Sequence, residues 1–244
     1  MDYKRSFENR VSQYKYAIRT YPGVMADEHA AVRDRLDLFD GCRVLDIGDS
    51  GVGGIDGGIS IDFEFENLPF ESGSFDRIVI LAVLHHISVG ERAVLYKECM
   101  RILVPGGRLV IADVIRDSAQ DYWLNMIVNR YNSNGHHGLF FNESDAQSIC
   151  SAGFDVKCER VSYYWYFRNL VEMEDFIINL FGMDLLGPGE NLYDIVNQNL
   201  GLLELGGEGE GGVKFEWQLI FFIAIVPPIY TPNARLVLDY HQPV

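Results

Sequence analysis

The chain has 244 residues and a formal net charge of −15, from 20 basic and 35 acidic side chains. Its residues are 48% hydrophobic and 23% charged, which fills a large core and excludes disorder over most of the chain. The negative charge repels phosphate backbones and anionic lipids, so neither nucleic acid nor a membrane surface is an expected partner. The length fits one large α/β domain, or one domain with an elaborated cap.

The four cysteines form no CxxC pair and are too few for a disulfide framework in a chain of this length. The start, MDYKRSFENR, lacks a signal-peptide pattern, so we expect a reducing, cytoplasmic location. The longest apolar run, 217–230, is too short to cross a bilayer and indicates a buried strand.

Strand and helix patterns alternate in the first half of the chain. The predicted elements are a helix over 26–38, strands over 43–47, 59–63 and 76–83, a helix over 89–104 and a strand over 108–112. The segment 76–83 is apolar on both faces, which is typical of a central parallel strand. This alternation predicts a parallel sheet covered by helices.

The second half has longer apolar segments and more aromatic residues. The predicted elements are a helix over 117–131, a short helix over 142–150, a strand over 156–167, a mostly helical segment over 170–205, a glycine-rich loop over 206–212 and a strand over 215–226. These patterns divide the chain into an N-terminal helical segment (1–41), a core (42–169), a helical lid with the glycine-rich loop (170–212) and a final strand with a tail (213–244).

Four motifs follow one another in the core. They are Asp46-Ile-Gly-Asp-Ser-Gly-Val-Gly-Gly54 after the first strand, the pair Leu68-Pro-Phe70 and Ser74-Phe-Asp76, Leu84-His-His86, and Leu103-Val-Pro-Gly-Gly107. In this order and spacing they resemble the class I S-adenosylmethionine-dependent methyltransferases, especially those acting on small molecules. The resemblance implies an α/β fold with a Rossmann-like methyltransferase sheet, mostly parallel, whose last strands form an antiparallel pair.

The resemblance also implies which residues contact S-adenosylmethionine. The positions are Asp46, Gly48, Ser50, Gly51, Asp62, Glu64, Leu81 and Ala82. Asp46 and Gly48 match the glycine motif that holds the methionine part, and Ser50 and Gly51 continue that loop. Asp62 matches the residue that binds the ribose, and Glu64 is an alternative carboxylate for the adenine amine. Leu81 and Ala82 match the strand that passes the sulfonium.

The cofactor segment departs from the family pattern in two ways. Ser50 and Val52 stand where the family has glycines, and a Cβ at position 50 hinders close approach of the backbone to a ligand. From Asp46 to Leu68 is 22 residues, too few for the two strands and two helices the family has there. We therefore predict missing elements after the first strand and a degenerate, shortened cofactor site.

Histidines and aromatic residues are the candidates for chemistry and substrate binding. His86 matches the family's histidine beside the transferred methyl, and His85 adjoins it, so both are candidate bases. The further candidates for the substrate pocket are His136, His137, Tyr164, Tyr166 and Phe181. We expect no metal, because adjacent histidines rarely ligate one ion and no cysteine or acidic partner has ligand spacing.

Two functions remain open at this point. The first is methyl transfer from S-adenosylmethionine to a small, aromatic or apolar metabolite. The alternative is a methyltransferase-like protein without that transfer, acting as a binding protein, a non-methylating catalyst or an inactive partner subunit. A homodimer, or a heteromer with an active methyltransferase, is compatible with either. The apolar segment 170–205 must bury its side chains, and we expect it to cap the carboxyl ends of the strands.

Overall fold

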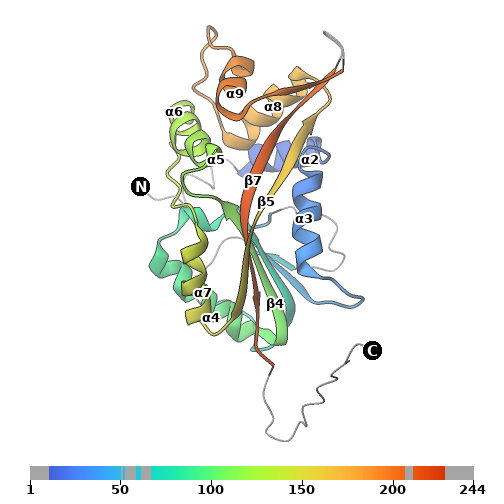
Figure 1. The fold of residues 1–244 in the computed structure, drawn as a ribbon, viewed down its shortest axis with the longest axis vertical. Coiled ribbons are helices and arrows are strands. Elements are labelled where there is room, and N and C mark those ends of the chain that lie inside the picture. Colours follow the sequence, from blue (N-terminus) through green and yellow to red (C-terminus); the bar gives the residue numbers. More distant parts are fainter. Residues whose placement is uncertain (1–10, 51, 53–58, 62–66, 207–210, 229–244) are drawn as a thin grey trace, which may run out of the picture.

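The structure is a computed structural model, which describes residues 11–50, 52, 59–61, 67–206 and 211–228 (Figure 1). Its strands are β1 (Val44–Ile47), β2 (Ile59–Ile61), β3 (Phe75–Leu81), β4 (Leu103–Val114), β5 (Asp155–Phe167), β6 (Leu203–Leu205) and β7 (Gly212–Ile225). Its α-helices are α2 (Val11–Thr20), α3 (Ala26–Leu36), α4 (Val89–Ile102), α5 (Ala119–Tyr122), α6 (Asn129–Tyr131), α7 (Ala146–Ser151), α8 (Leu170–Phe181) and α9 (Leu192–Leu200). Short helical turns are η1 (Leu84–His86), η2 (Trp123–Val128, a π-helix) and η3 (Glu143–Asp145).

All the described strands belong to one sheet of order β2-β1-β3-β4-β7-β5, with β6 paired to β7. The pairs β2–β1, β1–β3 and β3–β4 are parallel. β7 is antiparallel to each of its neighbours β4, β5 and β6, so within the described part of the chain it alone runs against the rest. The predicted sheet, mostly parallel with an antiparallel final strand, is confirmed.

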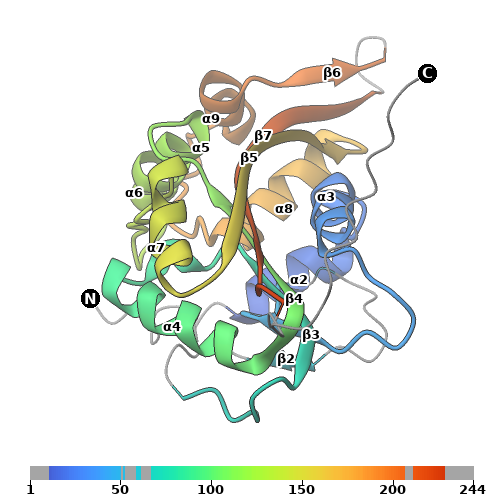
Figure 2. The ribbon, with the colours of Figure 1, turned by 60° about the horizontal axis from the view of Figure 1, so that its bottom comes forward.

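Alternation along the central strands divides the core between the two faces of the sheet. Ile78 and Ile80 of β3 pack with α4 and α7, whereas Val79 and Leu81 pack with α3 and the lid helices. Successive side chains of a strand point to opposite faces, which explains why β3 is apolar on both faces from Ile78 to Leu81. Figure 2 shows α4 crossing below the sheet, with α9 and β6 at the far end.

The segment between β1 and β3 is short, as the spacing predicts. β2 is the one strand that the structure describes there, and it forms the edge of the sheet. The sheet still has seven strands because β6 adds to β7 at residues 203–205, where the sequence predicted helix. That prediction was wrong because β7 extends past β4 and leaves backbone groups free to pair with Leu203–Leu205. The glycine-rich loop predicted over 206–212 lies partly outside the described residues.

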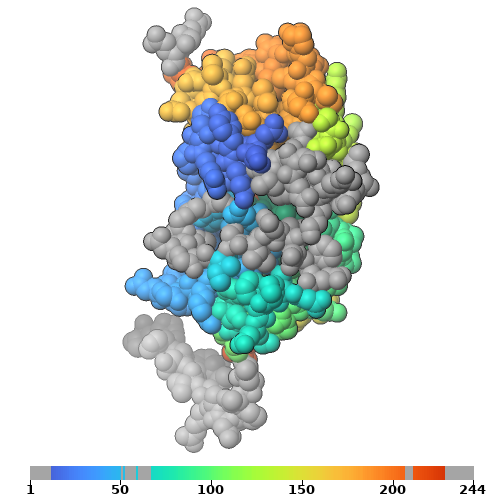
Figure 3. All heavy atoms as spheres, turned by 180° about the vertical axis from the view of Figure 1, so that it is seen from behind, coloured from blue at the N-terminus to red at the C-terminus, as the bar shows by residue number. Residues whose placement is uncertain are grey.

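The long strands β5 and β7 project beyond the end of β4. The last β4–β7 pair is Val114 with Leu219, but β5 and β7 remain paired as far as Phe167 and Val213. The aromatic rings of this projection stack on one another and on α8, with Trp165 and Trp217 at a centroid distance of 4.5 Å. Figure 3 shows α2, in dark blue, next to the orange α8–α9 region on this end of the molecule. The projection therefore carries the helical lid.

Local signals in the sequence explain the ends of the two longest helices. Ser88 and Glu91 form a reciprocal capping box at the start of α4. Asn169 caps α8, and Gly182 ends it in the left-handed conformation at φ 62°. Within the described ranges, no helix has the length and apolar content needed to cross a bilayer.

Candidate functional site

The carboxyl end of β3 turns sharply into η1 and places two histidines beside β4. Ala82 takes a left-handed φ of 51°, and its N–H still donates to the Ala112 carbonyl at 2.8 Å. The turn is fixed by Leu84, which is fully buried. Arg92 of α4 donates from Nε to the Leu84 carbonyl at 3.0 Å and also bonds the Leu139 carbonyl. The histidine turn is thus tied both to the sheet and to α4.

His85 is held by a fully buried carboxylate, that of Asp113 on β4. The His85 Nδ1 lies 2.7 Å from Asp113 Oδ1, and the His85 backbone N–H donates to Oδ2 at 3.1 Å. Because an ionised carboxylate only accepts, Nδ1 is the nitrogen that carries the proton in a neutral His85 ring, and Nε2 then has the lone pair. Asp113 therefore fixes the tautomer of an imidazole that is itself only 4% exposed.

A third histidine, His136, reaches the same place from the loop after α6. Asn125 and Asn129 stand on successive turns of the η2–α6 segment. The Asn129 Oδ1 accepts from the His136 backbone N–H at 2.8 Å, and the Asn125 Oδ1 lies 3.4 Å from His136 Nδ1. The Leu139 N–H donates to the His85 carbonyl at 2.7 Å, which joins this loop to η1.

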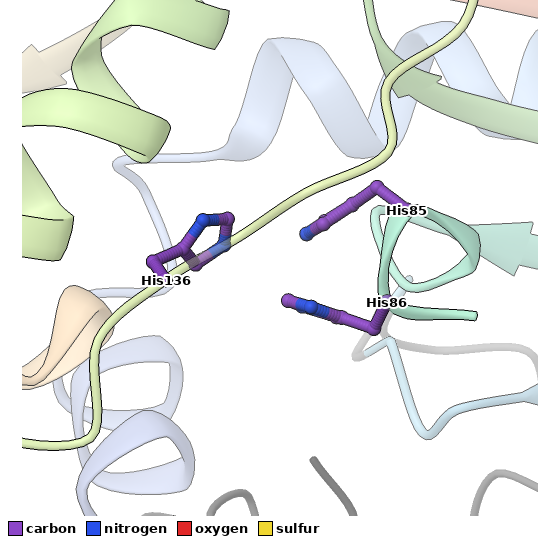
Figure 4. A group of neighbouring side chains, drawn as sticks. All are labelled: His85, His86 and His136. Carbon is purple, nitrogen blue, oxygen red and sulfur yellow. The ribbon is translucent and has the colours of Figure 1, made fainter. Parts of the chain in front are cut away.

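The three imidazoles form a cluster (Figure 4). Ring centroids are separated by 3.8 Å between His85 and His86, 5.4 Å between His85 and His136, and 5.1 Å between His86 and His136. Burial, followed by the charges of His85 and His136, lowers the pKa of His86 well below its ordinary value. Burial, followed by His85 and His137, lowers the pKa of His136 to about 3. Both of these rings are therefore neutral at physiological pH.

The cluster opens into a cavity of about 310 Å³. The cavity is lined by Tyr14, Met25, Glu28, Gly48, Leu81, Ala82, Val83, His85, His86, Val114, Leu124, Val128, Asn132, Asn134, Gly135, His136, His137, Trp165, Leu180, Phe181 and Trp217. Gly48 follows β1, and Leu81–Val83 end β3. β1 is the point from which the chain crosses to β2 on one side and β3 on the other, and open α/β sheets bind ligands in such a crevice.

The loop after β1 folds on itself as well as facing the cavity. The Asp46 carboxylate accepts from the Ser50 N–H at 3.2 Å and from the Ser50 hydroxyl at 2.9 Å. Ser50 is 2% exposed, and Lys15 pairs with Asp49 at 2.8 Å. Burial raises the pKa of Asp46, and its bonds with Ser50 oppose that shift. Of these loop residues, Gly48 alone is among those lining the cavity.

The predicted cofactor residues are therefore only partly assembled. Gly48, Leu81 and Ala82 line the cavity, and Asp46 and Ser50 shape the loop beside it. Gly51, Asp62 and Glu64 lie outside the described residues. Gly48 at the cavity edge is the position where the resemblance implies the methionine part of S-adenosylmethionine.

The predicted substrate residues divide in the same way. His136, His137 and Phe181 line the cavity. Tyr164 and Tyr166 do not, because they lie on the opposite face of β5, where Lys214 Nζ sits 4.0 Å above the Tyr164 ring. The aromatic wall is instead made by Trp165, on the other face of this strand.

Three further residues at the site were not identified from the sequence. Asp113 follows directly on a predicted parallel strand, so its position beside the neighbouring Leu84-His-His86 turn is a signal that could have found it. Trp217 pairs with Tyr163 across β5 and β7, which requires the strand register. Glu28 stands in a polar helical pattern without any local signal. It is 1% exposed, accepts from Trp165 Nε1 at 3.0 Å and has its pKa raised to about 7 by burial.

The known proteins that resemble this chain are consistent with the fold described above. Residues 54–111 match the family model described as a methyltransferase domain. Proteins named probable tRNA methyltransferase 9B, from Bos taurus and Homo sapiens, are each 48% identical over 46 residues. That match covers 18% of this chain and 10% of theirs, so most of each relative lies outside it.

Solved structures resemble the chain over most of its length at low identity. Phosphoethanolamine N-methyltransferase 2 of Haemonchus contortus, in complex with phosphomonomethylethanolamine and S-adenosylhomocysteine, has a TM-score of 0.50 at 17% identity, covering 88% of this chain and 60% of its own. The [4+2]-cyclase SpnF has the same TM-score and identity, and the match covers 83% of this chain and 81% of SpnF. A Haloferax volcanii protein in complex with the methyltransferase activator Trm112 has a TM-score of 0.50 at 14% identity, and the match covers 91% of this chain and 99% of that protein.

Residues 54–111 thus match a methyltransferase domain, and the chain shares its fold with solved S-adenosylmethionine-dependent methyltransferases. The resemblance that the sequence motifs predict is thereby confirmed.

Proposed function

We propose that the chain transfers a methyl group from S-adenosylmethionine to a small aromatic or apolar acceptor bound in the cavity. The observation that carries the proposal is the place of the cavity, at the crevice between β1 and β3, with an Asp113-oriented histidine on its wall. The family resemblance supports the choice of cofactor, which supplies a methyl group already activated on a sulfonium.

The chain's own residues would hold the cofactor and the acceptor on different walls. Gly48, Leu81 and Ala82 form the wall that fits the methionine part. Trp165 and Phe181 stack at a centroid distance of 6.2 Å with an interplanar angle of 17°, and Trp217 stacks on Trp165. Flat aromatic walls favour a flat or apolar acceptor and exclude water from it.

The histidine cluster would then act on the acceptor's proton. His85 presents the unprotonated Nε2 on the cavity wall, since Nδ1 is bonded to Asp113. Accepting a proton from the acceptor makes an imidazolium, which the Asp113 carboxylate stabilises. General-base catalysis of this kind contributes roughly 10²–10⁴-fold. His86 and His136 shield this end of the cavity and add polar contacts to the acceptor.

The alternative is a methyltransferase-like protein that does not transfer methyl groups. The Asp46–Ser50 bonds favour it, because they use a loop N–H that a glycine loop would otherwise offer to a ligand. The fold is also shared with a protein named a cyclase. Under either function we propose a cytoplasmic protein that works as a homodimer or with a protein partner, as the Haloferax volcanii protein does with Trm112.

The test is a transfer assay with isotopically labelled S-adenosylmethionine and a panel of small phenols, catechols and aromatic amines. The proposal expects label in at least one product, and expects the His85→Asn protein to lose most of that transfer while keeping its circular dichroism. Label appearing equally with the His85→Asn protein would contradict the assigned base. No label with any acceptor, despite bound cofactor, would favour the alternative.

A further inference from the structure

The histidine cluster has the composition and arrangement of a metal site. His85, His86 and His136 each offer one ring nitrogen, and these atoms all lie within 4.8 Å of one another. Figure 4 shows the three side chains converging from η1 and from the loop after α6. Nitrogens bound to one tetrahedral zinc at 2.0–2.1 Å are about 3.3 Å apart, so small rotations of the rings would close the cluster on an ion.

Two of the rings also have the outer partners that metal-bound histidines use. Asp113 bonds the Nδ1 of His85, and the Asn125 amide oxygen faces the Nδ1 of His136. The Gly138 N–H donates to the same Asn125 oxygen at 2.6 Å, which fixes the orientation of that amide. A carboxylate or carbonyl on one ring nitrogen leaves the other as a ligand and sets its direction.

The backbone around the cluster holds the rings together before any ion binds. Arg92 bonds the carbonyls of Leu84 and Leu139 and lies over the Phe141 ring at 3.9 Å. This buried side chain thereby connects η1 with the segment that follows His136. The three histidines also line the cavity, so an ion held by them would keep an open side for water or an acceptor.

The donor set narrows the kind of ion. Three imidazoles suit zinc and its neighbours cobalt, nickel and copper, whereas magnesium and calcium require oxygen ligands. We propose that His85, His86 and His136 bind a divalent transition-metal ion, with zinc as the physiological candidate. The sequence predicted no metal because the adjacent histidines were considered alone, and the third ligand comes from a loop that only the fold brings to them.

This inference goes beyond the proposed methyl transfer and does not depend on it, because metal binding needs neither cofactor nor acceptor. The ion would occupy the lone pair of His85 Nε2. The acceptor's proton would then pass to solvent water, and the ion would stabilise the deprotonated acceptor in place of the His85 base, since a bound cation lowers the pKa of an oxygen coordinated to it.

The test is a titration of the metal-free full chain with Co²⁺, followed by its visible absorption, and then displacement by Zn²⁺. We expect one ion per chain with the spectrum of a low-coordinate nitrogen site. His136→Ala should weaken binding by at least about 100-fold, and Asp113→Asn by about 10- to 100-fold, as for an outer partner. His137→Ala, which alters the neighbouring histidine of the same cavity, is the matched control and should bind like the unmodified chain.

The inference is overturned if no cobalt spectrum develops, or if His136→Ala and His137→Ala bind equally well while both remain folded by circular dichroism. Failure of the proposed function is distinguishable. Metal binding without binding of S-adenosylmethionine would support this inference and contradict methyl transfer. Binding of S-adenosylmethionine without metal binding would overturn this inference and leave the proposed methyl transfer standing.

Discussion

Replacing Asp113 with asparagine tests the central device of the site, the carboxylate that orients His85. The side chain keeps its size, and its amide oxygen can still accept from the His85 backbone N–H, which donates to Oδ2 at 3.1 Å in the unmodified chain. Its NH₂ group then takes the place of Oδ1 beside His85 Nδ1 and can donate, so Nδ1 would become the acceptor and Nε2 would carry the proton, while the Val114 N–H would lose its acceptor. The change therefore inverts the tautomer without emptying the space.

The magnitude follows from the bonds that are lost. The 2.7 Å contact joins a fully buried carboxylate to a ring N–H, and hydrogen bonds to charged groups contribute about 1.5–3 kcal/mol. We expect Asp113→Asn to lower the free energy of unfolding by an amount in that range. Methyl transfer should fall further, by roughly 10²–10⁴-fold, because Nε2 can no longer accept a proton.

Long-range ¹H–¹⁵N spectra of the imidazoles report the tautomer directly and need no acceptor. The unmodified chain should show His85 protonated at Nδ1, and Asp113→Asn should show it protonated at Nε2. Glu172→Gln is the control, because it alters another largely buried carboxylate, whose side-chain partner is Arg168. An unchanged His85 spectrum in Asp113→Asn would refute the reasoning, since Asp113 would then have only a packing role.

Three further predictions concern the lid, the buried carboxyl and the cofactor. Phe181→Asp should impair ligand binding or dimerisation at least as much as it lowers the melting temperature. The control Val171→Asp, at a residue 74% exposed, should change neither binding and dimerisation nor the melting temperature. If Phe181→Asp lowered the melting temperature alone, Phe181 would be a core residue without a role in binding or dimerisation. Burial raises the pKa of Glu28 from 4.5 to about 7. The stabilisation of the folded state by this carboxyl is therefore complete below pH 4.5 and is lost as the pH rises through 7. The loss in the free energy of unfolding is about 3 kcal/mol, at 1.36 kcal/mol per pKa unit. Urea unfolding at pH 4.5 and 8 should show this loss in the unmodified chain and not in Glu28→Gln; equal losses in both would place the titration elsewhere. Losing two loop hydrogen bonds of about 1.5–3 kcal/mol each should weaken S-adenosylmethionine binding at least about a hundredfold relative to a protein with an intact glycine loop. Calorimetry of this chain and of a typical family member would measure the two affinities. Equal affinities would contradict this prediction.

The sheet could be predicted from the sequence because its signals are local. The run 76–83 is apolar on both faces, and Pro105-Gly-Gly107 comes directly before another apolar run, so both strands were found. The observed β4, Leu103–Val114, is longer than the predicted 108–112 because it already includes Pro105-Gly-Gly107. The short β6 could not be predicted, because it exists only through pairing with the projecting end of β7. Leu203 and Leu205 are both exposed, so no burial pattern marks them as strand.

The site was predictable in part for a related reason. His85 and His86 follow a recognisable strand end, but the contact of His136 with them depends on a loop held by Asn125, Asn129 and the Leu139–His85 backbone bond. Which aromatic face of β5 meets the cavity depends on how the strand is twisted and covered. Alternation separates Tyr164 from Trp165, but it does not say which of them faces a ligand.

Calorimetry of the pure chain with S-adenosylmethionine and S-adenosylhomocysteine is the most direct test of the central claim, that the cavity beside β1 and β3 is a shortened methyltransferase cofactor site. The claim predicts that each ligand binds once per chain with a dissociation constant above ~1 µM, which corresponds to a binding free energy weaker than about −8.2 kcal/mol. The absence of any saturable binding by either ligand would contradict the claim that this is a cofactor site. Sub-micromolar binding of S-adenosylmethionine would contradict the claim that the site is degenerate.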